Sequence, residues 1–267
     1  MLDRVAVYVA PMRQLDPKEL ASLERCWLPD RPGPLVALHA IRTGNGTAFA
    51  DRWPEPRVIL ASAGGNFSLS GDAGALRPED LEGRVEGFLD APREFEPLLR
   101  EAFPGLHAWE RVMHELRGDP PLVAAQGATL RGLGPEDEWR LWGLRTDTSW
   151  IAKTWGGPAG LAGSRRAFGA LLGGELASVA APFFVGDRYV DIGVVTERAR
   201  RGRGLSPACA AALARDLLAQ GVRPSWTTSP DNAASLRVAA KLGFERARSD
   251  VLYVIGEPVP LPARPPG

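Results

Sequence analysis

Cysteine is nearly absent from this chain: Cys26 and Cys209 are the only two in 267 residues. They lie far apart and neither has the spacing of a metal-ligand motif, so the sequence predicts neither a disulfide framework nor a zinc site. Histidine is scarce too, and His39, His107 and His114 all fall in the first half without the spacing of a metal pair. Lone histidines of this kind are more often ordinary, partly buried residues. We therefore expect no metal.

Long apolar runs and an excess of one charge are also missing. No apolar segment approaches the roughly 20 residues that cross a bilayer, and the apolar N-terminal stretch is too short for a signal peptide. The 32 basic and 32 acidic residues give a net charge of zero, which provides no long-range attraction to nucleic acid or an anionic membrane. We expect a soluble cytoplasmic protein, monomeric or homodimeric, that binds neither.

The first half of the chain mixes helices and strands. A helix is predicted at residues 15–27, with Asp16 as N-cap and Pro17 at its first position. Residues 35–41 fit a strand or a short helix, because periodicity does not distinguish the two for a short apolar run. The other predicted elements of this half are strands at 47–53, 57–63, 66–70, 84–89 and 109–116 and a helix at 94–103. No catalytic motif is evident in them.

A domain boundary is predicted at Gly118-Asp119-Pro120-Pro121, because Pro-Pro after Gly-Asp interrupts both strands and helices. This divides the chain into an N-terminal α+β domain (1–120), a second domain (121–257) and a Pro-rich tail (258–267). In the second domain we predict strands at 128–133, 167–172, 175–181, 189–195 and 224–228 and a last strand or hairpin at 245–255. We also predict helices at 135–144, 207–220 and 229–243, and a mobile Gly-rich loop at 154–163. Tryptophans 139, 142, 150 and 155 cluster there. They could line a substrate groove, but tryptophans at helical spacing more often belong to the core.

A Gly-rich basic loop precedes the clearest helix of the chain. Arg201-Gly-Arg-Gly-Leu-Ser206 follows an apolar strand, and we expect the helix to start at Pro207 with Ser206 as its N-cap. Glycines allow positive φ and close approach of a ligand. Free N–H groups at a helix start, beside two arginines, favour a phosphate or pyrophosphate. The alternative is a plain Gly-rich turn in a basic surface loop.

The ordered combination of motifs resembles the acyl-CoA-binding core of the GNAT superfamily of N-acetyltransferases. The matching segments are Asp191–Thr196, Arg201–Ser206, Asn232, Ser235 and Lys241-Leu-Gly-Phe244, within residues 128–256. The resemblance implies an α/β (α+β) fold, with a mixed twisted sheet flanked by helices. A weak echo of the later hairpin in the first half suggests a degenerate second copy of this fold; a cap on the acceptor groove or a dimer contact are the alternatives.

The resemblance also implies a donor site, in which acetyl-CoA or another acyl-CoA lies between two parallel strands that splay apart, 189–196 and 225–228. Strand backbone would pair with the pantetheine arm, loop N–H groups would hold the pyrophosphate, and the next helix would contact the pantetheine or phosphate region. The residues implied are Val194, Val195, Thr196, Arg201, Gly202, Arg203, Gly204, Leu205, Ser206, Asn232 and, as a weaker match, Ser235.

Two departures from the family pattern affect the expected chemistry. The loop ends on Ser206 where the family has Gly or Ala, although a hydroxyl can itself face a phosphate. Many members have a Tyr that protonates the leaving thiolate, and the matching position here is Ala239. The second half has no histidine, so a general base must be a carboxylate or an ordered water. Asp191 and Glu175 are the acids nearest the expected cleft, and we name Asp191 as the catalytic candidate.

The sequence therefore predicts a GNAT-type acyltransferase that moves an acetyl group from acetyl-CoA to an amine, by direct attack in a ternary complex. The acceptor, a small molecule or a peptide, is not identified by the sequence. A non-catalytic acyl-CoA-binding sensor or assembly subunit is the alternative, kept open by Ala239 and by the unassigned first half. A dinucleotide site is disfavoured, because Pro207 occupies the third glycine position and no ribose-binding acid ends the next strand.

Overall fold

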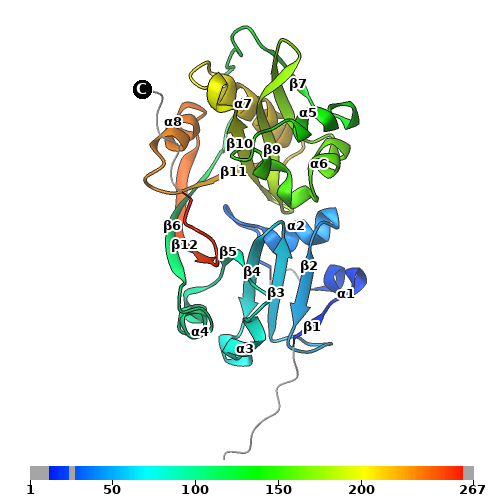
Figure 1. Ribbon diagram of the computed structural model, residues 1–267, viewed down its shortest axis with the longest axis vertical. Coiled ribbons are helices and arrows are strands. Elements are labelled where there is room, and N and C mark those ends of the chain that lie inside the picture. Colours follow the sequence, from blue (N-terminus) through cyan, green and yellow to red (C-terminus); the bar gives the residue numbers. More distant parts are fainter. Residues whose placement is uncertain (1–11, 24–27, 261–267) are drawn as a thin grey trace, which may run out of the picture.

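The computed structural model describes residues 12–23 and 28–260, and its strands form one twelve-stranded sheet. The strand order is β1-β2-β3-β4-β5-β12-β6-β11-β10-β9-β8-β7. Among the strand pairs described, only β4–β5 and β10–β11 are parallel. Helices flank this twisted sheet along its length (Figure 1). The predicted mixed α+β fold is confirmed.

The N-terminal half begins with a well-capped helix. Asp16 accepts hydrogen bonds from the N–H groups of Lys18 and Glu19, and Pro17 is the first helical residue, as predicted. The segment at 35–41 is helical. The elements of this half are β1 (Arg13–Gln14), α1 (Pro17–Ser22), α2 (Val36–Thr43), β2 (Thr47–Ala50), β3 (Val58–Ala63), β4 (Asn66–Gly71), α3 (Pro78–Leu81), β5 (Gly87–Asp90), α4 (Glu96–Ala102) and β6 (His107–Glu115). The last part of the helix predicted at 15–27 lies outside the described residues.

The C-terminal half supplies the remaining strands and the two long helices. Its elements are β7 (Thr129–Gly132), α5 (Glu138–Trp142), the 3-10 helix η5 (Ser149–Trp155), α6 (Pro158–Ser164), β8 (Phe168–Leu172), β9 (Glu175–Val185), β10 (Tyr189–Thr196), α7 (Leu205–Ala219), β11 (Arg223–Thr228), α8 (Ala233–Lys241) and β12 (Glu245–Ile255). The Gly173-Gly174 hairpin is confirmed by the pairing of β8 with β9. The last helix starts later than predicted, because Asn232 is its N-cap.

The mobile loop predicted at 154–163 is wrong, because this segment is the end of η5 followed by α6. Gly156, with φ of 74°, ends η5, and Pro158 opens α6 at its first position. A Cβ on Gly160 would lie 1.9 Å from the carbonyl oxygen of Trp155. These glycines therefore serve a tight reversal and a close backbone approach, and they do not make the segment a loop.

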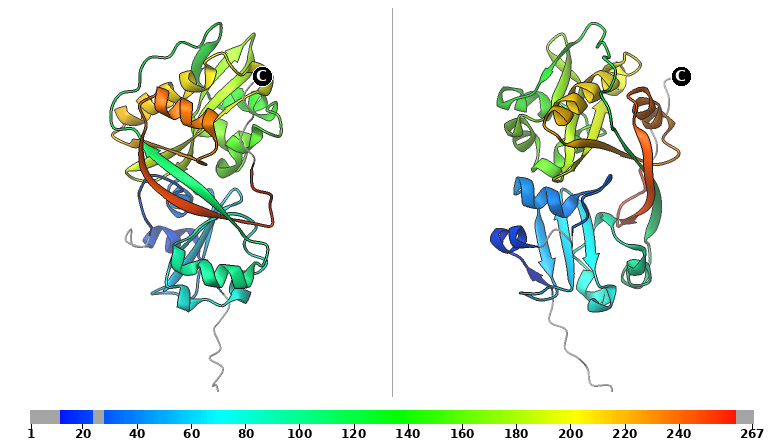
Figure 2. Two further views of the ribbon diagram at one scale, coloured as in Figure 1. Left: turned by 90° about the vertical axis from the view of Figure 1, so that its left-hand side faces the viewer. Right: turned by 180° about the vertical axis from the view of Figure 1, so that it is seen from behind.

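The two halves repeat one order of elements and exchange their last strands. In each half, a hairpin (β3–β4, β9–β10) leads to a strand that pairs in parallel with the last strand of the hairpin (β5, β11). The strand that follows crosses over: β6 pairs with β11, and β12 pairs with β5 and with β6. Figures 1 and 2 show β6 and β12 running side by side between the halves. The boundary at 120/121 stays a prediction, but β6, which precedes it, is part of the C-terminal half's sheet.

Helix α2 packs in the junction between the halves, against β3 on one side and β9 on the other. His39 on this helix is fully buried. Its Nε2–H donates to the Thr154 carbonyl at 2.8 Å, and the Val185 N–H donates to its Nδ1 at 3.3 Å. Burial lowers the pKa of His39, so the ring is neutral and ties α2 to η5 and β9.

Candidate active site

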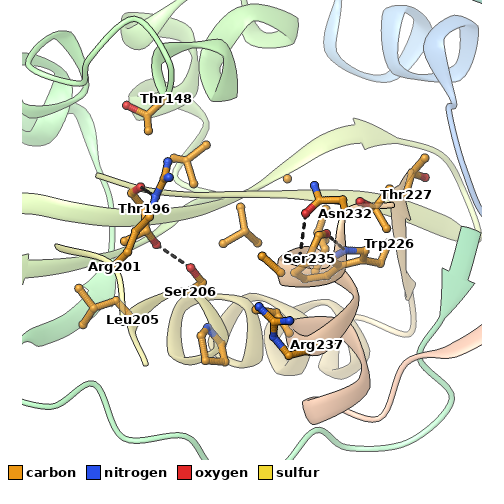
Figure 3. Close-up of a pocket in the computed structure, with 18 of the residues that line it drawn as sticks. Thr148, Thr196, Arg201, Leu205, Ser206, Trp226, Thr227, Asn232, Ser235 and Arg237 are labelled. Atoms are coloured by element: carbon orange, nitrogen blue, oxygen red, sulfur yellow. Dashed lines mark hydrogen bonds between the residues drawn. The ribbon is translucent and has the colours of Figure 1, made fainter. Parts of the chain in front are cut away.

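A gap opens between the parallel strands β10 and β11. They pair only at their starts, at Tyr189↔Arg223, Val190↔Pro224 and Asp191↔Ser225. Beyond that point β10 stays paired with β9 as far as Thr196, while β11 pairs with β6 on its other side. The backbone of residues 192–196 therefore has no β11 partner. A cavity of about 780 Å³ lies along this gap, between the ends of α7 and α8 (Figure 3).

The Gly-rich loop forms one wall of the cavity. Gly202 and Gly204 have φ of 79° and 72°, a conformation that favours glycine. Helix α7 begins at Leu205 with Gly204 as N-cap, so the prediction that Ser206 caps a helix starting at Pro207 is wrong. The reason is the left-handed backbone at Gly204, which turns the chain into the helix earlier than the proline.

The N–H groups of residues 202–206 have no hydrogen-bond acceptor among the residues that the structure describes. The first turn of a helix leaves such donors free, and the helix dipole adds a partial positive charge there. The side chain of Ser206 has a partner: its Oγ lies 2.6 Å from Thr196 Oγ1, which lies 2.7 Å from Ser178 Oγ. This hydroxyl chain links α7, β10 and β9, and it leaves the backbone N–H groups of the loop without a side-chain partner.

Helix α8 forms the opposite wall. Asn232 caps it by accepting the Ser235 N–H at 3.1 Å. Ser235 Oγ in turn accepts from the indole N–H of Trp226 on β11 at 2.8 Å, which holds α8 against that strand (Figure 3). Ala239, at the position of the family tyrosine, is buried in the core and presents no proton donor. Asn232 and Ser235 therefore reach the cavity as parts of the α8 start.

The structure brings most of the predicted site residues together around the cavity. Those that line it are Val194, Val195, Thr196, Arg201, Gly202, Gly204, Leu205, Ser206, Asn232 and Ser235. Arg203 does not line the cavity; its side chain is exposed on the outer side of the loop. Asp191 does not line it either. Glu175 lies at the β8–β9 turn, away from the cavity.

Asp191 is buried behind the cavity wall, with 5% of its surface exposed. Its Oδ1 accepts hydrogen bonds from Ser225 Oγ and Thr227 Oγ1, both at 2.9 Å. Burial raises the pKa of this carboxyl to about 6, although the two hydroxyls and Arg111 lower it. Thr227 does line the cavity, so the hydroxyl of Thr227 connects Asp191 to it.

Several cavity residues were not predicted from the sequence. Trp109 and Arg111 come from β6 of the first half, and Trp150 comes from η5. Gly193 lets η5 approach, because a Cβ there would lie 2.7 Å from Ile151 Cδ1. A strand at 109–116 was predicted from the sequence, but its pairing with β11 was not. The expectation that the tryptophans are core is wrong for residues 139 and 142, which are 57% and 68% exposed.

The charged residues of the cavity are mostly basic. Arg200 and Arg201 line it beside the loop, Arg237 and Lys241 line it from α8, and Arg111 lines it from β6. Arg201 reaches across to Asp147, with 3.6 Å between Nη2 and Oδ2. The described residues contain no cluster of three or more His, Cys, Asp or Glu side chains that could hold a metal. Nor do they contain a helix long and apolar enough to cross a membrane.

Comparison with known proteins places this geometry in a family. A curated relative from Streptomyces virginiae, "Uncharacterized N-acetyltransferase in mutA 5'region", is 38% identical over 213 residues, which cover 78% of this chain and 90% of the relative. The GNAT acetyltransferase profile matches residues 152–253. The chain belongs to the GNAT acetyltransferase family. It is a GNAT-type acyltransferase, and the resemblance on which that prediction rested is confirmed.

Solved GNAT structures share the fold over nearly the whole chain, including the first half. A GCN5-related N-acetyltransferase-like protein from Streptococcus suis matches with a TM-score of 0.65 at 20% identity, covering 89% of this chain and 98% of that one. A tandem GNAT protein from the clavulanic acid biosynthesis pathway matches with a TM-score of 0.55 at 16% identity, covering 91% and 94%. At these identities the likeness concerns the fold, and it agrees with the repeated order of elements in the two halves.

Proposed function

We propose that this GNAT enzyme binds acetyl-CoA in the gap between β10 and β11 and transfers its acetyl group directly to an amine. The observation that carries the proposal is the row of free N–H groups at residues 202–206, beside the unpaired edge of β10. These donors suit a pyrophosphate. Arg200, Arg201 and Arg237 add positive charge at the same end.

The unpaired edge of β10 suits the pantetheine arm. Residues 194–196 have β9 on one side only, so their remaining backbone groups can pair with the amides of an extended ligand. Residues 121–257 then bind the donor, while residues 1–120 contribute β6 to the other end of the cavity. Pro260, in the tail predicted at 258–267, also lines the cavity.

Acetyl-CoA supplies an activated acyl group: the amine nitrogen bonds to the thioester carbonyl carbon, the carbon–sulfur bond breaks, and coenzyme A leaves as a thiolate that takes up a proton. The nitrogen must lose a proton in this exchange. Thr227 donates its own hydroxyl proton to Asp191, so its lone pairs are available to accept an amine N–H. Asp191 takes up the proton through Thr227, for which a pKa near 6 is suited at neutral pH.

Isothermal titration with acetyl-CoA tests the donor site, and release of free thiol in the presence of amines tests transfer. We expect binding of acetyl-CoA and amine-dependent thiol release. Absence of binding would remove the donor site from the gap. Binding without turnover on a broad panel of amines would contradict the transfer and favour a module that only senses acyl-CoA.

A further inference from the structure

Arg111 is a cation without a counter-ion at the end of the cavity away from the phosphate loop. Its Nε is buried without a hydrogen-bond partner, and its Nη2 makes one long contact, of 3.4 Å, to the Thr227 carbonyl. No described carboxylate forms an ion pair with it; Asp191 and Asp231 attract it from farther away. Burial lowers its pKa to about 10, which is the sign of a poorly solvated charge.

The position of Arg111 separates it from the phosphates of the donor. Side chains alternate across a sheet, and in the β11–β6 pairing Thr227 lies opposite Met113, two residues from Arg111. Arg111 and Thr227 therefore share one face, while Trp226 points to α8 on the other. In Figure 3, Thr227 lies at the end of the pocket opposite Thr196 and Arg201. An anion bound by Arg111 is thus a different anion from the pyrophosphate.

The residues around Arg111 are arranged to bind a ligand more than to hold two strands together. The guanidinium lies 4.0 Å from the ring centroid of Trp109, which fixes its plane. Trp109 and Trp150 both line the cavity and offer apolar surface. Leaving a buried guanidinium unpaired is costly unless a ligand completes its hydrogen bonds, and a planar guanidinium matches a carboxylate.

We propose that the acceptor is an amine that also carries a carboxylate, bound by Arg111, with its hydrocarbon part against Trp109 and Trp150. The carboxylate on Arg111 places the amine beside Thr227, the hydroxyl that accepts its N–H. This inference rests on the proposed function. It assigns the acceptor to the class of amino acids and related amino carboxylic acids.

The test compares amines that differ only in the carboxylate, such as phenylalanine with phenethylamine and β-alanine with ethylamine. We expect the wild-type protein to favour the carboxylate member of each pair by about tenfold or more in kcat/KM, the usual worth of a charged hydrogen bond. Arg111→Gln is expected to abolish this preference and to leave the KM for acetyl-CoA nearly unchanged. Wild type and variant are assayed with the same amines, so differences in amine pKa cancel when their preferences are compared.

The matched control is Arg237→Gln, another arginine of the cavity at its phosphate end. It is expected to raise the KM for acetyl-CoA and to leave the carboxylate preference intact. Partial recovery of the preference in Arg111→Lys would support a charge contact. If Arg111→Gln slows all amines equally, Arg111 only holds the strands and the inference is wrong; if wild type shows no preference, it is wrong without any variant. Binding of acetyl-CoA, measured separately by titration, shows whether the proposed function fails instead.

Discussion

Asp191→Asn is expected to make the protein more stable at pH 8 and less active. In the native protein burial raises the pKa of Asp191 from 3.8 to about 6. Each pKa unit corresponds to 1.36 kcal/mol, so keeping this carboxylate ionised at pH 8 costs the fold about 3 kcal/mol. Asparagine keeps an oxygen for the Ser225 and Thr227 hydroxyls and removes the charge. We expect a gain of about 1–3 kcal/mol in the free energy of unfolding.

The sign of the effect depends on pH. The folded state holds the Asp191 proton more tightly than the unfolded state, so the stability contributed by this group is lost as pH rises from about 4 to about 6. Urea unfolding of both proteins at pH 4 and pH 8 measures this. The difference should shrink to less than about 1 kcal/mol at pH 4, because the carboxyl is then mostly protonated in the folded state. A variant that is less stable than wild type at pH 8 would refute the reasoning.

Asp137 provides the contrasting control for the same substitution. It is fully buried but bound by Arg131 at 2.6 Å and by Arg140 at 3.0 Å. The hydrogen bonds from Arg131 lower the pKa of this carboxyl. Asp137→Asn should therefore destabilise the protein, by about 3 kcal/mol as for a broken buried pair. The two substitutions should change the free energy of unfolding in opposite directions, because Asp191 lacks an ion-pair partner and Asp137 has two.

The loss of activity in Asp191→Asn follows from its proposed role behind Thr227. Removing a general base slows a reaction by about 10²–10⁴-fold. In wild type, kcat/KM should also fall as pH drops through about 6, where Asp191 takes up a proton. The variant should lack this step and keep only the titration of the amine. If the variant keeps the pH profile of the wild type, the amine proton passes to water and not to Asp191.

Three further predictions concern single groups. Gly204→Glu should weaken acetyl-CoA binding in titration about 100-fold or more through clash and repulsion at the phosphates, whereas Gly221→Glu, with a similar φ of 76° outside the cavity, should not. Burial lowers the pKa of His39 below 6.5, so the unfolded state binds the proton more tightly. The free energy of unfolding should therefore decrease as pH is lowered below about 6.5, and it should decrease less steeply in His39→Gln. Burial raises the pKa of Cys209 to about 12, so iodoacetamide should label it only after unfolding, as peptide mapping would show.

The elements around the proposed donor site were predictable because their signals are local. A glycine-rich loop, a strand before it and a capped helix after it lie within one stretch, and each has its own residue pattern. What local patterns missed was conformation inside the loop. Gly204 rather than Ser206 is the N-cap of α7, because the left-handed backbone of Gly204 starts the helix at Leu205, and the hydroxyl of Ser206 contacts Thr196 instead. The residue type of a predicted cap does not show whether its hydroxyl bonds another side chain instead, as Ser206 does with Thr196.

The proposed acceptor part of the site was not predictable because it depends on pairing between distant segments. Trp109 and Arg111 reach the cavity only because β6 crosses over to pair with β11, more than a hundred residues later. The alternation along β6 defines its two faces but not its neighbour. The same limit applies to Trp139 and Trp142, whose helical spacing predicted burial although both side chains are exposed.

The strand exchange explains how a half without a Gly-rich loop of this kind still contributes to the cavity. In the first half, the connection between the parallel strands β4 and β5 holds only the short helix α3 and a 3-10 turn, so nothing there corresponds to the start of α7. Its contribution is instead β6, which carries Arg111 and Trp109 to the strand that bears Thr227. In the proposed site, the second half thus binds the donor, and the first half adds Arg111 and Trp109 for the acceptor. Because β12 makes the reciprocal crossing to β5, neither half completes its own sheet without the other.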